Sequence, residues 1–201
     1  MEKKFPAERL RNLILFPSYE WKVISLEKVS LRETFSSVIM KLILAGAVAE
    51  FAGSFFYVRN VLDIDAYRFS IPLVRSLFYL LIQVLLIMTG SVFIHRIAGK
   101  YSEKTDFSRT AKLVAYSWVP VLLLFIIANL HQVLIVALIP GVYSIVLFWK
   151  GSVDMLGIPE IRKPALAVMY TLTMLGMMFL LTRGFGFLLS LVFPDLLPAA
   201  G

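Results

Sequence analysis

Four stretches of this chain contain no charged residue over a length that would cross a lipid bilayer. These stretches are residues 77–94, 113–130, 132–149 and 165–182. A transmembrane helix needs about 20 apolar residues to cross ~30 Å of hydrocarbon. Charged residues make up 16% of the chain, whereas a soluble domain contains about 25%. The sequence therefore predicts an all-α fold, a polytopic membrane helix bundle.

A fifth apolar stretch precedes the other four. Residues 35–57 are apolar except for Lys41 and Glu50, and we expect them to form the first of five spans. The residues before this stretch contain no apolar run suited to a signal peptide, so the span is expected to be retained. The predicted domains are a cytoplasmic segment, residues 1–34, and a five-span membrane domain, residues 35–201. The spans are expected at about 35–57, 74–95, 112–130, 131–149 and 164–183.

The lysines and arginines between these spans predict the orientation of the chain. On one side, the N-terminal segment carries seven, the connection between spans 2 and 3 carries five, and that between spans 4 and 5 carries three. The segments on the other side carry three, none and one. Because basic residues are enriched on the cytoplasmic side, we expect a cytoplasmic N-terminus and an outside C-terminus. A prokaryotic protein of this kind would lie in the cell membrane.

The segment before the first span, LFPSYEWKVISLEKVSLRETF (residues 15–35), is charged and contains a tryptophan. We predict an amphipathic helix here, with Ser18 as its N-cap. Trp21, Ile24 and Lys28 share one face of this helix by their spacing. An indole ring suits the headgroup layer of a membrane, so the helix is interpreted as an interfacial anchor or as a docking surface for a cytoplasmic partner.

A second helix start follows within the same segment. Ser30 and Glu33 have the spacing of a capping box, in which the serine oxygen accepts a hydrogen bond from the amide of the glutamate. We therefore expect the chain to turn at Ser30 into the first span. Glu20 and Glu27 are expected to lie mostly away from the Trp21 face.

Three runs of residues resemble a known family. FPSYEWKVISLEKVS with the apolar AGAVAEFAGSFF is similar to the start of the first span in prokaryotic Yip1-family proteins. FSRTAKLVAYSWVPVLL resembles the start of that family's third span, and GVYSIVLFWKGSVDMLGI its fourth span and the loop after it. The resemblance covers nearly the whole chain.

What the resemblance implies agrees with the charge distribution. The family has five spans, a cytoplasmic N-terminus and an outside C-terminus, and in eukaryotes it implies membrane organisation or trafficking. The DLYGP-like N-terminal signature of the eukaryotic branch is absent from this chain. The resemblance therefore does not imply a small-GTPase partner here.

Spans 3 and 4 form a hairpin with a mirrored pattern. Pro120 and Pro140 are equally distant from the expected tip at Leu130, and each proline is expected to bend its helix near mid-membrane. Tyrosines and serines recur at matched depths on the two helices: Tyr116, Ser117, Tyr143 and Ser144. This belt is interpreted either as a packing seam or as a polar notch that binds a headgroup or passes a small solute.

Glu50 is an acidic residue within the first span, where an ionised carboxylate costs about 2.5–3.5 kcal/mol unless it is paired or wetted. By depth, its possible partners are Tyr79, Gln83 and Arg75. The alternatives are a structural pair or protonated carboxyl, and a working group in a proton or ion path.

No other chemistry is indicated. The chain has no cysteine, its two histidines are expected at opposite ends of the bundle, and its basic residues flank spans without forming a nucleic-acid patch. We predict no catalytic, cofactor or metal site. The hypothesis is a non-enzymatic scaffold or adaptor of Yip1 type that works in the lipid bilayer with a membrane or cytoplasmic protein or a second copy. The alternative is a small channel or transporter that uses Glu50 and the hairpin.

Overall fold

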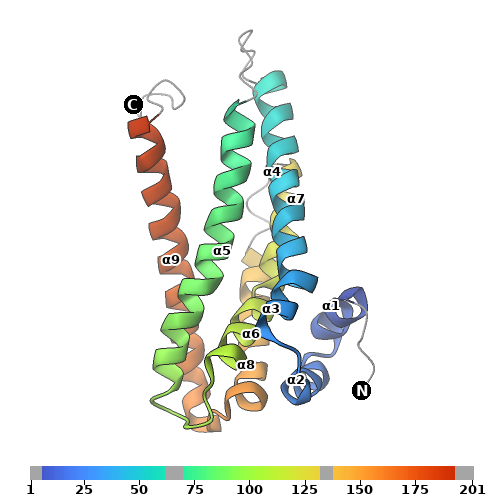
Figure 1. Ribbon diagram of the computed structural model, residues 1–201, viewed down its shortest axis with the longest axis vertical. Coiled ribbons are helices and arrows are strands. Elements are labelled where there is room, and N and C mark those ends of the chain that lie inside the picture. Colours follow the sequence, from blue (N-terminus) through green and yellow to red (C-terminus); the bar gives the residue numbers. More distant parts are fainter. Residues whose placement is uncertain (1–5, 62–69, 132–137, 193–201) are drawn as a thin grey trace.

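A computed structural model describes residues 6–61, 70–131 and 138–192, which are helical apart from short connections (Figure 1). The first part contains α1 (Pro6–Leu15), α2 (Pro17–Leu26), α3 (Leu31–Thr34), the π-helical turn η1 (Phe35–Ile39) and α4 (Met40–Val61). The second contains α5 (Ser70–Ala98), α6 (Phe107–Ser117) and α7 (Val119–His131). The third contains α8 (Leu138–Leu156), the 3-10 turn η3 (Glu160–Arg162) and α9 (Lys163–Val192).

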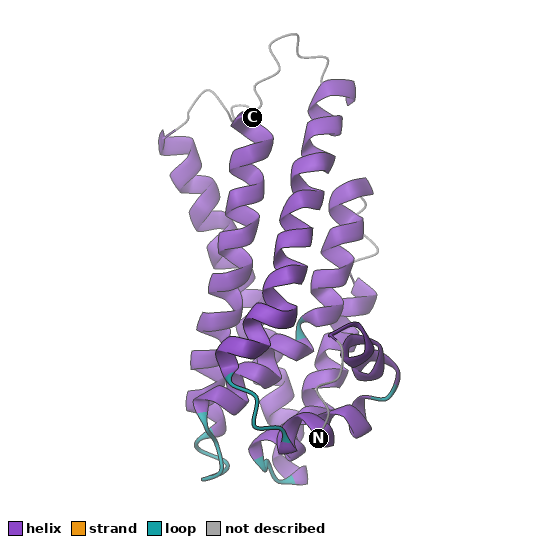
Figure 2. Cartoon of the chain, turned by 45° about the vertical axis from the view of Figure 1, so that its right-hand side comes forward, coloured by secondary structure: helices purple, strands orange, loops and turns teal. Residues whose placement is uncertain are grey.

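The helices form an elongated bundle in which the short helices α1 and α2 lie at one end only (Figure 1). Helices α4, α5 and α9 run along its long axis (Figure 1). Helices α1 and α2 lie at one end, and the loops 99–106 and 157–159 lie at the same end (Figures 1 and 2). We call this the N-terminal end. Helix α9 leads from it to the opposite end.

Four segments of the described chain are long and apolar enough to cross a membrane: Leu31–Phe56, Pro72–Ala98, Phe107–Asn129 and Glu160–Leu188. The sequence predicted five. The missing one corresponds to α8, which is described only from Leu138 and carries two charged residues, Lys150 and Asp154, near its end. Each of the four segments begins before the predicted start of its span, and for the first and third spans the reason is a helix start capped by Ser30 and by Asp106.

The first span begins where the sequence predicts. Ser30 is the N-cap of α3, and its Oγ accepts a hydrogen bond from the Glu33 amide at 3.1 Å. The π turn η1 follows directly. Such a turn disturbs the regular ladder of backbone hydrogen bonds, and Ser36 and Ser37 donate to the carbonyls of Glu33 and Thr34 at 3.3 and 3.4 Å.

The third span is interrupted at Trp118, between α6 and α7. Pro120 explains the break, because it lacks an amide donor and crowds the carbonyl of Tyr116. The predicted effect of this proline on its helix is therefore present as an interruption at Trp118. Pro140 lies in the first turn of the described α8, and the hairpin connection after His131 lies outside the described residues.

The end of α8 is set by a glycine. Gly157 has a φ of +65°, a left-handed conformation that glycine adopts without steric cost. Its amide donates to the carbonyl of Val153 at 2.8 Å, and the chain then turns toward α9. This turn brings Tyr170 of α9 against Phe148 of α8, with stacked rings whose centroids are 4.0 Å apart.

Candidate functional site

The second helix of the N-terminal pair α1–α2 begins two residues earlier than predicted. Helix α2 starts at Pro17, and Phe16 is its N-cap without a side-chain hydrogen bond. The predicted cap, Ser18, lies inside the first turn and is exposed. The reason is that proline is favoured at the first helical position, where its missing amide leaves no carbonyl unpaired.

Trp21 is fully buried in protein, so its predicted place in the headgroup layer is wrong. Its ring meets Tyr116 of α6 edge-on, with centroids 6.3 Å apart. On the other side it lies against Gly151 of α8. A Cβ at Gly151 would lie 2.6 Å from Trp21 Cε2 and 2.6 Å from Leu113 Cδ1, so only a glycine lets α2 approach α8 this closely.

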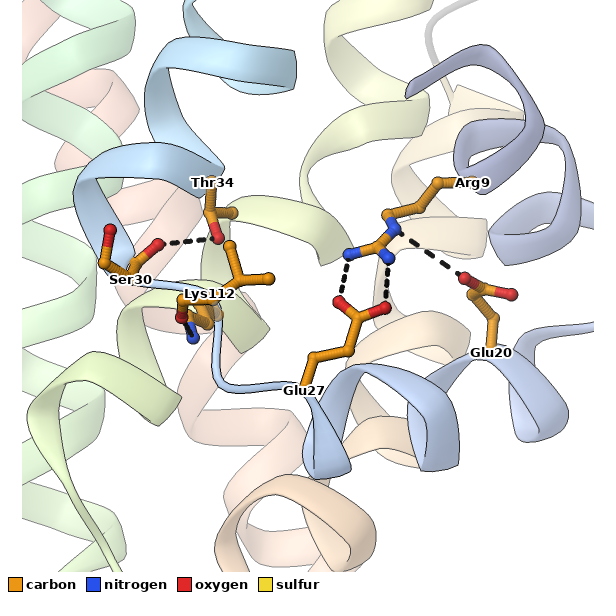
Figure 3. A network of polar contacts seen from close by, with 7 residues as sticks. Arg9, Glu20, Glu27, Ser30, Thr34 and Lys112 are labelled. Carbon is orange, nitrogen blue, oxygen red and sulfur yellow. Dashed lines mark hydrogen bonds and ion pairs between the residues drawn. The ribbon is translucent and has the colours of Figure 1, made fainter. Parts of the chain in front are cut away.

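The charged residues of the pair face one another (Figure 3). The guanidinium of Arg9 donates two hydrogen bonds to the Glu27 carboxylate, one of 2.6 Å from Nη1 to Oε2 and one from Nη2 to Oε1. Glu20 lies 3.8 Å from Arg9 and is fully buried. Glu20 and Glu27 were predicted to lie away from the Trp21 face. They instead turn inward because α1, which the sequence analysis did not predict, supplies Arg9.

Arg9 is held in its charged form. Burial alone would lower the pKa of its guanidinium, but hydrogen bonds to Glu27 and Tyr116 outweigh that effect and raise the pKa. The cation thus ties α1 to the end of α2 and to α6 of the bundle. Bidentate arginine–carboxylate pairs of this kind are among the stronger polar contacts in proteins.

Two more contacts attach the pair to the bundle through its backbone. The Tyr143 hydroxyl of α8 donates to the carbonyl of Ile14, and the Lys112 ammonium of α6 donates to the carbonyl of Val29 (Figure 3). We call these contacts, with Trp21 and the Arg9 pair, the docking seam. Ile24 is buried in it, whereas Lys28 follows the end of α2 and is exposed, so Lys28 does not share the Trp21 face.

The predicted Tyr/Ser belt therefore meets the N-terminal helices. Tyr116 and Tyr143 both belong to the docking seam or touch it. The Ser144 hydroxyl is bonded to Tyr170 at 2.8 Å, and the buried Ser117 hydroxyl has no hydrogen-bond partner among the described residues. This arrangement fits the packing-seam interpretation of the hairpin better than a notch open to solvent.

Glu50 forms a second polar cluster, farther from the N-terminal end. Its Oε1 accepts hydrogen bonds from Arg75 Nε at 2.8 Å and from Ser54 Oγ at 3.0 Å. Glu50 is buried, while 54% of the Arg75 side chain is exposed. Of the three predicted partners, Arg75 is thus the one that pairs with Glu50.

The other two predicted partners lie on the same helix, α5, but bond elsewhere. Gln83 accepts a hydrogen bond from Trp118 Nε1 at 3.0 Å. The Tyr79 ring packs against Gly46, and its buried hydroxyl has no hydrogen-bond partner among the described residues. Asn129 donates to the Gly46 carbonyl at 3.3 Å. These contacts join α4, α5 and α7.

One surface of the helix pair was missed by the sequence analysis. Leu15, Phe16, Tyr19 and Leu26 are all exposed. A signal for it exists, because Tyr19, Val23 and Leu26 have the spacing of a second apolar helix face. Helix α2 therefore has two apolar faces, one packed on the bundle and one directed outward.

Most polar groups of the docking seam bond to other groups of that seam, and most of those around Glu50 bond to each other. Within the described part of the chain, no group of three His, Asp or Glu residues could hold a metal ion. The arrangement fixes helices to each other, and its chemistry is that of ion pairs and hydrogen bonds.

The family model of the Yip1 domain matches residues 11–182. No curated protein and no solved structure matches the chain.

Proposed function

The chain belongs to the Yip1 domain family, and from this premise we propose that it is a non-enzymatic protein that organises its membrane or recruits protein partners through the helix pair α1–α2. One observation carries this proposal. The pair is fixed to the bundle by the docking seam, yet it keeps a second apolar face exposed. A segment that served only to close the end of the bundle would not need that second face.

The proposed orientation places the helix pair in the cytoplasm and the C-terminus outside. It is supported by the position of the basic segments: the N-terminal helices and the loops 99–106 and 157–159 lie at one end of the bundle (Figure 2). These segments belong to the longer connections whose basic residues predict the cytoplasmic side. In this orientation α8 makes the remaining one of five crossings.

The orientation can be tested with single cysteines, because the chain has none of its own. We would place one cysteine at Lys22, Lys104, Glu160 or Ser190, all exposed, and treat intact cells with a membrane-impermeant maleimide. We expect labelling at Ser190 only, and labelling of the other three after the membrane is opened. Labelling of Lys22→Cys in intact cells would invert the proposed orientation.

The organising role can be tested with a photo-crosslinker at Lys22 or Lys28, two exposed positions of the N-terminal segment. We expect crosslinks to a defined protein or to lipid in cells. A matched crosslinker at Lys104 serves as the control, because it lies at the same end of the bundle but outside the helix pair. The proposal fails if Lys22 and Lys28 give no more crosslinks than Lys104.

The channel or transporter alternative predicts a different result. Here Glu50 is paired with Arg75, and the docking seam covers the hairpin belt. We therefore expect vesicles containing the protein to show no protein-dependent proton or ion flux. A flux that Glu50→Gln abolishes, with the protein still folded, would replace the organising role by transport.

A further inference from the structure

The exposed corner between α1 and α2 is unusually apolar for the end of a bundle. Leu15, Phe16 and Tyr19 are the exposed apolar residues of this corner, each about 60% exposed. We call these three residues the apolar corner. Leu13 and Pro17, on either side of Leu15 and Phe16, are buried, so the corner is a fixed edge of the folded chain.

Contacts with α8 relate the apolar corner to the membrane interface expected at Lys150. The carbonyl of Ile14, adjacent to the corner, accepts a hydrogen bond from Tyr143. Tyr143 lies seven residues before Lys150 on α8, which is about 10 Å along the helix axis toward the apolar part of the bundle. Lysines near helix ends mark the membrane interface. The corner therefore lies on the hydrocarbon side of that interface.

Basic residues flank the corner. Arg11 of α1 and Lys22 of α2 are exposed, and the next exposed basic residue is Lys28. An apolar edge bordered by Lys and Arg is the pattern of helices that lie in a membrane interface. A docking site for a soluble acidic protein would have the charges but would not need three apolar side chains at this depth.

We infer that the apolar corner inserts into the acyl-chain layer of the leaflet at the N-terminal end of the bundle, with lipid as its occupant. This inference rests on the proposed function and identifies what the exposed face of the helix pair binds. The residues of the helix pair that contact lipid are thus Leu15, Phe16 and Tyr19. They lie on the side of the pair opposite to Trp21. Insertion enlarges the cross-section of the protein in that leaflet alone.

Spin labels can test the insertion. Single cysteines at Phe16 and at Tyr19 would carry a nitroxide in the full-length protein, reconstituted into phosphatidylethanolamine–phosphatidylglycerol vesicles. Collision with oxygen reports the acyl-chain layer, and collision with a water-soluble nickel chelate reports the aqueous phase. Phe179→Cys, exposed on the membrane-spanning α9, is the lipid reference, and Lys104→Cys, exposed in the loop 99–106, is the aqueous reference.

We expect the Phe16 and Tyr19 labels to match the Phe179 reference, with high oxygen and low nickel accessibility. Nickel accessibility equal to that at Lys104 would overturn the inference. Labels that are shielded from both reagents and show dipolar broadening would overturn it too, because the corner would then be covered by a second copy.

The two proposals fail separately. If the labels are aqueous while Lys22 and Lys28 still crosslink to a protein in cells, the organising role stands without lipid insertion. If the labels match the lipid reference but crosslinking is no greater than at Lys104, the corner is an anchor and the organising role falls. A double variant, Phe16→Ser with Tyr19→Ser, keeps the docking seam and is expected to increase nickel accessibility at a label on Leu15.

Discussion

The third span and α9 are both strongly apolar, but they are buried to very different degrees. Of the residues in the most apolar part of Phe107–Asn129, 78% are buried in the protein. The corresponding share for Glu160–Leu188 is 22%. Composition alone does not distinguish the two helices.

The difference shows what fixes a helix inside a membrane protein. Lipid tails are as apolar as leucine, so apolar character gives no preference for a protein neighbour over lipid. The third span carries groups that need protein partners: Lys112 bonds to the N-terminal segment and Trp118 to Gln83. Most of the side chains of α9 can be satisfied by lipid, apart from those such as Tyr170 that bond to α8.

The largest expected effect is at the tryptophan that packs on the third span. Trp21→Ala removes a fully buried ring and should lower the free energy of unfolding by about 3–5 kcal/mol. Unfolding can be followed in detergent micelles by titration with a denaturing detergent. Trp149→Ala, a partly exposed tryptophan of α8, is the control and should cost about 1 kcal/mol or less. Equal losses would mean that α2 is not packed on the bundle in solution.

The next largest effect is the loss of stability when a buried ion pair is weakened, compared with the loss at an exposed one. Glu27→Gln weakens the charged hydrogen bonds to Arg9 and should lower the free energy of unfolding by about 1.5–3 kcal/mol. The matched variant is Glu160→Gln, whose carboxylate pairs with Lys163 at the start of α9 but is largely exposed. Its loss should stay below about 1 kcal/mol. Melting temperatures of both variants in the same micelles would show the contrast, and a reversed order would contradict it.

A smaller effect is expected inside the membrane. Trp118→Phe removes the donor to Gln83 and should cost about 0.6–1.7 kcal/mol, the range of hydrogen bonds between membrane helices. Adding Gln83→Leu to this variant should recover part of the loss, because no buried polar group then lacks a partner. If the double variant is less stable than Trp118→Phe alone, the hydrogen bond is not the reason for the loss.

The smallest effect is expected on α9 itself. Phe179 is exposed to the surroundings of the bundle, so Phe179→Ala should change the free energy of unfolding by about 0.5 kcal/mol or less. Met174→Ala on the same helix is the comparison, because Met174 is buried beside Gly90 and should cost more. A large loss at Phe179 would break the contrast between the two helices and indicate a protein neighbour on α9.

The sequence was most informative where one physical rule decides. Long apolar runs located four membrane-crossing segments, because water excludes them regardless of their neighbours. Ser30 was correctly predicted as a cap and Pro120 as a break, since both effects act within four residues. The family resemblance is confirmed by the Yip1 domain match.

The sequence was least informative for side chains that suit two different environments, because residues far along the chain decide between them. The indole of Trp21 suits a headgroup layer as well as a protein interior, and its choice depends on Gly151, far along the chain. The inward turn of Glu20 depends likewise on Arg9, in a helix that was not predicted. The candidate site was therefore predicted in part: Arg75 was among the partners named for Glu50, but the docking seam was not foreseen.

The docking seam also has a consequence for how the chain is made. Its first-synthesised parts bond to much later ones: Ile14 to Tyr143, 129 residues further on, and Val29 to Lys112, 83 residues further on. At a synthesis rate of about 5–20 residues per second, helices α1 and α2 would leave the ribosome on the order of ten seconds before α8 exists. During that interval the buried face of α2, with Trp21 and Glu20, lacks the part of the bundle that α8 supplies. This face is therefore fully covered only after the last helices are inserted.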